Sequence, residues 1–124
     1  MKQLFVVFNK YLPLIVWCLT IFFLSNSDQP DVGTTYWTNL VAKKLAHIVE
    51  YAILGLLSYR ALNKSKIKAL IFVLLYGISD EIHQSLVPGR EPRIRDIFID
   101  VIGGFIGLWI VKYLPLKIQQ KLGI

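Results

Sequence analysis

Residues 94–111 read IRDIFIDVIGGFIGLWIV, and this stretch changes character at its midpoint. Its first half carries three ionisable side chains, whereas its second half carries no formal charge. Ionisable side chains are costly inside a bilayer and are rarely kept there for packing alone. The stretch therefore predicts a membrane helix with one polar, functional half. We expect this helix to cover residues 94–114 and to end at Pro115.

The same division appears in the two preceding stretches. Residues 66–87 are apolar first and polar last, residues 40–62 are polar first and apolar last, and residues 4–27 form an apolar run. A spanning helix needs about 20 residues. We therefore predict a single domain over residues 1–124, an all-α membrane protein with four transmembrane helices in an antiparallel bundle. Because the helices alternate in direction, the three polar halves fall at the same membrane depth.

The distribution of charge predicts the orientation of this bundle. Cytoplasmic loops of membrane proteins carry an excess of lysine and arginine. With both termini inside, the inner side holds cations and no acid, namely Lys2, Lys10, Arg60, Lys64, Lys66, Lys68, Lys112, Lys117 and Lys121. All eight acidic residues then lie in the outer half. The sequence thus predicts an N-in/C-in, multi-pass protein of the cell membrane.

Composition narrows the function classes. The 124 residues are 55% hydrophobic with a net charge of +6, and the cations flank apolar segments instead of forming a basic stripe. We therefore expect no nucleic-acid partner and expect contact with membrane lipid. The single Cys18 excludes an internal disulfide. A competing interpretation takes residues 1–27 as a cleaved signal peptide, although the apolar run is long and no cleavage site is clear.

The first polar cluster is Lys44, His47 and Tyr51, spaced i, i+3 and i+7 on one helix face. Histidine exchanges a proton near neutral pH, and lysine binds an anion or pairs with a carboxylate. This spacing favours a functional face. The alternative is an interfacial helix end with lysines extending toward the headgroups.

The second cluster is Asp80, Glu81 and Gln84, on the next predicted helix. Adjacent acids at membrane depth repel each other unless cations compensate them. The cluster is able to hold a proton or to bind a metal. Alternatively, its acids are structural counter-ions to Lys44 and the arginines. No HExxH or paired-cysteine spacing supports a metal, so we expect no metal and no cofactor.

The third cluster surrounds the start of the last helix. Arg90 is able to bind phosphate or carboxylate in a bidentate way. Asp96 and Asp100 lie one turn apart, ahead of Gly103-x3-Gly107. Such a glycine pair lets another helix approach closely, which would press the two acids against the second and third helices. The same face is also a candidate contact for a homo-oligomer.

Together, these motifs resemble the VanZ-like family, named for a protein associated with teicoplanin resistance in bacteria. The family pattern is Lys-x2-His-x3-Tyr in one helix, Asp-Glu-x2-Gln ending another, and Pro-Gly-Arg before an Asp that opens a glycine-rich helix. This chain has all of these motifs in that order, over roughly residues 20–110. One position differs, because the family often has Asn where this chain has Asp100. The resemblance implies a bacterial integral membrane protein and, loosely, a role in glycopeptide resistance or the cell envelope.

We therefore expect an outward-facing ionic pocket that recognises or modifies an anionic envelope lipid or glycolipid precursor. The expected acid–base residues are His47, Asp80, Glu81 and Asp96, and the expected binding residues are Lys44, Tyr51, Gln84, Arg90 and Asp100. Two alternatives remain: an oligomeric proton-coupled transporter or relay, and a non-catalytic structural component of the envelope. The sequence leaves open whether the protein is an enzyme.

Overall fold

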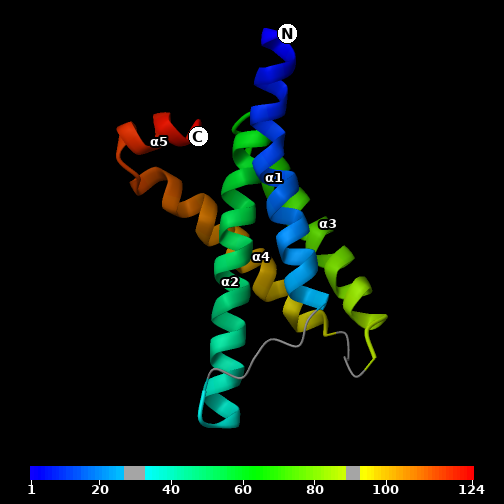
Figure 1. Cartoon of the computed structure of the whole chain (residues 1–124). Helices are drawn as coiled ribbons and strands as arrows, with labels where there is room; N and C mark the ends of the chain where they lie inside the picture. Colours follow the sequence, from blue (N-terminus) through cyan, green and yellow to red (C-terminus); the bar gives the residue numbers. More distant parts are fainter. Residues whose placement is uncertain (27–32, 89–92) are drawn as a thin grey trace.

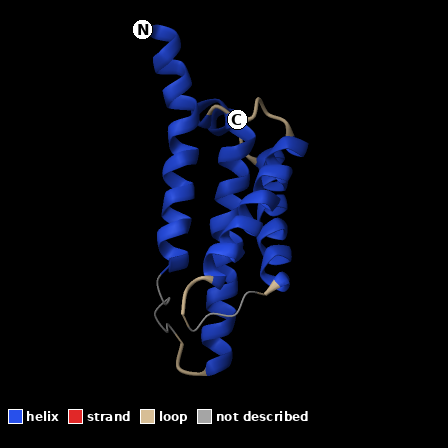
Figure 2. Cartoon of the chain, turned by 90° about the vertical axis from the view of Figure 1, so that its right-hand side faces the viewer, coloured by secondary structure: helices blue, strands red, loops and turns tan. Residues whose placement is uncertain are grey.

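The part of the chain that the structure describes is helical and contains no strand (Figure 2). This computed structural model describes residues 1–26, 33–88 and 93–124, apart from the side chains of Lys2 and Gln3. The helices are α1 (Lys2–Asn26), α2 (Tyr36–Ala61), α3 (Lys66–Ser85), α4 (Ile94–Ile110) and α5 (Leu116–Leu122), with a 3-10 turn η1 (Val111–Tyr113) after α4. The predicted all-α class is confirmed.

Helix α2 begins four residues earlier than predicted because Thr35 caps it. The Thr35 hydroxyl accepts a hydrogen bond from the backbone N–H of Thr38 at 3.3 Å, and the Thr38 hydroxyl accepts one from the Thr35 N–H at 3.0 Å. This reciprocal capping box satisfies two backbone donors that a helix start would otherwise leave without partners. The cap therefore extends α2 by one turn at its polar end.

Helices α1 to α4 alternate in direction, as predicted (Figure 1). The two termini lie at one end of the bundle in both views (Figures 1 and 2). The end of α3 and the starts of α2 and α4 lie at the opposite end, so the polar halves of these three helices meet there. Helices α2 and α4 run in the same direction and make the most extensive contact in the bundle.

Glycines on α4 allow this close contact with α2. A Cβ atom built on Gly103 would lie 2.7 Å from the carbonyl oxygen of Ile48, and one on Gly107 would collide with the Ala52 carbonyl. A glycine of α2 also takes part: a Cβ on Gly55 would lie 2.6 Å from the carbonyl oxygen of Gly104 on α4. The expected close approach of another helix at Gly103 and Gly107 is therefore made by α2 of the same chain, and the homo-oligomer through this face stays a prediction.

The short helix α5 was not predicted from the sequence. It begins after Pro115, which ends the α4–η1 segment as expected. The Gln119 side chain donates hydrogen bonds to the carbonyl oxygens of Val111 and Leu114, at 3.1 and 2.8 Å. The Leu114 carbonyl lies at the end of the preceding helical segment, where backbone donors run out, and the Val111 carbonyl also accepts the Leu114 N–H at 3.2 Å. Helix α5 thus covers the end of α4.

The bundle buries several acidic side chains within a mainly apolar core and exposes many large apolar side chains. Asp80, Glu81 and Asp100 are at most 6% exposed, whereas α1, α3 and α4 present large apolar side chains on their outer faces. Within the described residues, α1 alone is long and apolar enough to cross a membrane by length and composition, over Leu4–Asn26. Helix α4 has 17 residues, and α2 and α3 carry the ionisable side chains. The other three predicted spans and the N-in/C-in topology stay predictions.

Candidate functional site

The charged face of α2 meets α4 in two successive contacts, an ion pair and a histidine–carboxylate pair. The Lys44 ammonium group binds the Asp96 carboxylate, and His47 Nδ1 lies 3.3 Å from Asp100 Oδ1. Because α2 and α4 run in the same direction, residues one turn apart on α2 pair with residues one turn apart on α4. The glycine contact just described brings the two helices close enough for both pairs to form.

The His47–Asp100 pair is asymmetric in its exposure. The Asp100 side chain is 3% exposed and lies behind the ring, whereas the His47 side chain keeps 14% of its surface exposed. A carboxylate that accepts from Nδ1–H fixes the tautomer of the imidazole and leaves Nε2 as its basic nitrogen. Such a pair is suited to take a proton from a bound group and to return it.

Asp80 is the centre of a second cluster, built by α1, α2 and α3. Its Oδ2 atom accepts hydrogen bonds from Ser25 Oγ and Gln84 Nε2, both at 2.8 Å, and a long one from the Tyr51 hydroxyl at 3.5 Å. Gln84 also donates to Ser25 Oγ at 3.2 Å. The carboxylate is 4% exposed. Among the described residues, these neutral donors are the groups that offset its burial.

The two clusters adjoin each other at the small residue Gly77. A Cβ atom there would lie 3.4 Å from Asp100 Oδ2 and 3.7 Å from Tyr51 Cε1. The rings of His47 and Tyr51 are nearly parallel, at an angle of 16°, with their centroids 6.4 Å apart. Ionisable and hydroxyl groups therefore follow one another inward from His47 to Asp80.

Glu81 has a different position from its neighbour Asp80. Its Oε2 atom accepts a hydrogen bond at 3.3 Å from the backbone N–H of Arg93, the residue that precedes α4. A carboxylate at a helix start satisfies a free backbone donor and interacts favourably with the helix dipole. In this structure Glu81 ties the end of α3 to the start of α4, and its predicted acid–base role stays a prediction.

The structure thus brings most of the predicted residues together. Arg90 lies outside the described residues. Ser25 was missed as a site residue, because a lone serine at the end of an apolar helix is common. Trp17 was missed as well; its indole N–H donates to the Glu50 carbonyl at 2.9 Å and holds α1 against α2.

The second histidine, His83, lies apart from the His47–Asp100 pair. Its ring packs on Phe22 with centroids 4.2 Å apart. Its Nε2 atom is buried without a hydrogen-bond partner among the described residues. His83 therefore serves as an internal comparison for the role of His47.

In the described residues, no three His, Cys, Asp or Glu side chains are grouped as ligands for a metal ion.

Comparison with known proteins gives the family of the chain. No curated protein and no solved structure matches the sequence. The VanZ/LLP1 family model matches residues 7–116, which include every residue of the site described above. Because this match covers most of the chain and agrees with the motif order, the protein belongs to the VanZ/LLP1 family.

Proposed function

We propose that the protein is a multi-pass membrane protein whose helices α1 to α4 all cross the bilayer. VanZ-like proteins are membrane-associated, and α1 has the length and composition of a span. The apolar outer faces of α3 and α4 support further spans, since a water-soluble bundle would bury them. Tyr36 and Trp37, both 71% exposed, lie at the polar end of α2 as expected for aromatic side chains at a membrane interface.

Cysteine accessibility tests this topology. In a Cys18→Ser background, we expect a membrane-impermeant maleimide to label Tyr36→Cys in intact cells, because position 36 lies at the outer end. Lys66→Cys, at the start of α3, should react only after the membrane is permeabilised. Both native residues are exposed, so each new thiol is open to the reagent. The reverse labelling pattern would contradict the N-in/C-in topology.

Within that topology, we propose that the polar end is an acid–base site for an anionic envelope lipid or lipid-linked precursor. The observation that carries this proposal is the His47–Asp100 pair, with a buried carboxylate behind a partly exposed imidazole. Lys44 lies one turn away and is 29% exposed, so an incoming anion competes with Asp96 for its ammonium group. His47 would then exchange a proton with the bound group. A link to glycopeptide resistance belongs to the same proposal, through a change in the envelope lipid.

Substitutions of His47 and Lys44 test the site. The protein is reconstituted in phosphatidylcholine nanodiscs with an envelope lipid extract, and retained and altered lipids are identified by mass spectrometry. We expect His47→Gln to retain lipid but to lower any conversion about 100-fold or more, because general acid–base catalysis contributes that much. Lys44→Gln should lower retention. His83→Gln is the matched control and should behave as wild type in both measurements.

The outcomes separate the possible functions. If the wild-type protein neither retains nor alters an anionic lipid, the lipid proposal fails. If each site variant fails to accumulate in the membrane while His83→Gln accumulates normally, the charges form a structural network, as in a non-catalytic envelope component. Normal accumulation with altered lipid handling supports the acid–base site.

A proton relay is the second candidate, and the succession of ionisable and hydroxyl groups at the polar end favours it. From His47 and Asp100, the Tyr51 hydroxyl leads to Asp80, Ser25 and Gln84. A relay of this kind predicts proton flux across proteoliposomes, read with an internal pH-sensitive dye, and Asp80→Asn should abolish it. Flux equal to that of empty liposomes would exclude the relay and leave the lipid proposal untouched.

A further inference from the structure

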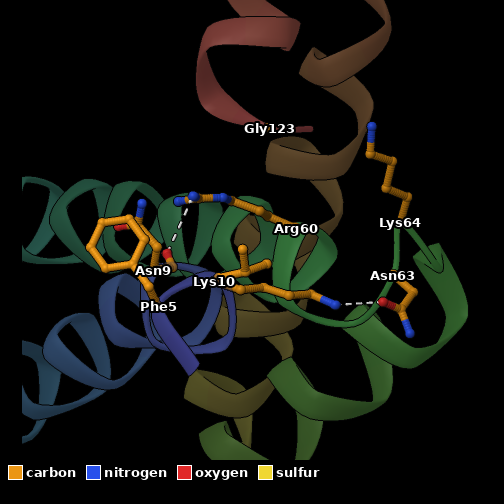
Figure 3. A pocket seen from close by; sticks show the side chains of 8 residues that line it. Phe5, Asn9, Lys10, Arg60, Asn63, Lys64 and Gly123 are labelled. Carbon is orange, nitrogen blue, oxygen red and sulfur yellow. Dashed lines mark hydrogen bonds between the residues drawn. The ribbon is translucent and has the colours of Figure 1, made fainter. Parts of the chain in front are cut away.

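A cationic cavity lies at the opposite end of the bundle from the charged site. It has a volume of about 390 Å3 and is lined by α1, the end of α2, the loop after α2 and Gly123 near the C-terminus (Figure 3). Three of its lining residues are cations: Lys10, Arg60 and Lys64. Its size falls in the range of small-molecule sites, which is roughly 300 to 1,000 Å3.

Acidic side chains are absent from the described surroundings of these cations. No carboxylate is present among the described residues that line the cavity. Residues 51–79 and 101–124 contain no Asp or Glu at all, so the nearest acids along the chain from Arg60 and Lys64 are Glu50 and Asp80, which belong to the other end. The bonds that the structure gives these cations go to neutral oxygens: Lys10 donates to Asn63 Oδ1 at 2.5 Å, and Arg60 to the Asn9 carbonyl at 3.3 Å (Figure 3).

A proline fixes the position of Arg60. The Asn9 carbonyl would normally accept the N–H of residue 13, but Pro13 has none, so the carbonyl is left without its helix partner. Arg60 Nη2 takes that place. One bond uses one of the five N–H donors of the guanidinium group, which leaves others for a bidentate contact with an anion.

The loop that carries Lys64 has an unusual backbone. Asn63 and Lys64 both have a φ of 58°, in the left-handed region that lysine rarely adopts. Backbone strain of this kind is retained where the surroundings demand it, often at functional sites. The Lys64 N–H donates to the Tyr59 carbonyl at 2.8 Å and locks the turn. The exposed Lys64 side chain extends from this turn beside the cavity (Figure 3).

We infer that this cavity binds the phosphate group of an anionic membrane lipid. Phe5 and Val6 give it an apolar wall, and both belong to the exposed apolar face of α1 that would carry an acyl chain. A phosphate group in this cavity would neutralise cations for which the described lining residues provide no carboxylate side chain. Free inorganic phosphate offers the same chemistry without the apolar contact, and the experiment distinguishes the two sources.

The test uses the full-length protein in detergent micelles, with bound lipid counted by native mass spectrometry. We expect the wild-type protein to retain phosphatidylglycerol in preference to phosphatidylcholine. Lys64→Gln should weaken this binding about fivefold, because it removes one of the cations that line the cavity. Lys117→Gln, an exposed cation of α5 that does not line the cavity, is the matched control and should bind as wild type.

A second variant separates binding from folding. Lys64→Gly removes the cation while accepting the positive φ without a steric penalty, so its thermal midpoint should equal or exceed that of wild type while lipid retention falls. If inorganic phosphate raises the thermal midpoint of the wild-type protein as much as phosphatidylglycerol does, the cavity is an anion site and its ligand is free phosphate. No preference for phosphatidylglycerol, or an equal loss in Lys117→Gln, would overturn the inference.

Discussion

Gly107→Ala is expected to lower the free energy of unfolding by about 3 kcal/mol, the upper end of the usual effect of overpacking. The added Cβ would collide with the Ala52 carbonyl oxygen and would lie 2.8 Å from the carbonyl carbon and 2.9 Å from the Cα of the same residue. These are backbone atoms of α2, so no side chain is able to rotate away. The helices must separate, although alanine is the better helix former by about 1 kcal/mol.

The matched control is Gly77→Ala, on α3. A Cβ there would lie 3.4 Å from Asp100 Oδ2, which is an ordinary contact distance. This variant should be as stable as wild type or more stable by up to about 1 kcal/mol, because alanine favours the helix. Unfolding in mixed micelles, followed by circular dichroism, measures both variants. Equal stability of the two variants would mean that α4 does not approach α2 as closely as described.

This contact also explains how the site forms. Helix α4 reaches its charged partners on α2 because the glycine segment one to two turns further along sets the distance between the helices. Gly107→Ala should therefore disturb the Lys44–Asp96 and His47–Asp100 pairs as well as the packing. We therefore expect Gly107→Ala to lower stability and to alter lipid retention or conversion at the same time, although it changes no site residue.

The sequence predicted which faces would be charged and at which end they would meet. Helical periodicity placed Lys44, His47 and Tyr51 on one face, and the structure turns this face toward Asp96, Asp100 and Asp80. The partner of each group was not predictable. Pairing depends on the rotation and register of two helices, which the glycine contacts determine, and periodicity within one helix contains no information about register.

The helix boundaries show the same difference between local and tertiary signals. The third helix starts at Lys66 as predicted and ends two residues early, at Ser85. The start of α2 was missed although its signal was local: Thr35 and Thr38 form a capping box without the usual Glu or Gln. Helix α5 has seven residues, too few for a periodic pattern, and it depends on Gln119 contacts with the end of α4.

Ser25 shows why the site was only partly predictable. An ionisable residue in an apolar stretch is a strong signal, but a serine is not, because its hydroxyl often bonds within its own helix. Its role depends on α1 lying beside α3, 55 residues away in sequence. The charged members of the site were therefore visible in the sequence, whereas the neutral donors that make their burial tolerable were visible only in part.

Loss of the acceptor that these neutral donors share should have a large effect on stability. Asp80→Ala removes the acceptor of Ser25, Gln84 and Tyr51 in one step and should destabilise the protein by about 2 to 4 kcal/mol. The estimate follows from about 0.6 to 1.7 kcal/mol for a hydrogen bond inside a membrane protein, with a further contribution from donors left buried without a partner. Asp80→Asn should have a smaller effect, since the amide oxygen is able to replace Oδ2, the only atom for which the structure gives these contacts.

Glu81→Ala is the matched control, because it removes the adjacent carboxylate on the same helix. That side chain accepts the one N–H of Arg93 at 3.3 Å, so its loss should cost about 1 kcal/mol. The same unfolding measurement ranks the three variants, and we expect Asp80→Ala to be the least stable and Asp80→Asn to fall nearer to wild type. If Asp80→Ala proves no less stable than Glu81→Ala, then Asp80 does not hold α1, α2 and α3 together. In that case its burial among neutral donors points to proton exchange rather than to structure, and the Asp80→Asn flux measurement becomes the decisive experiment.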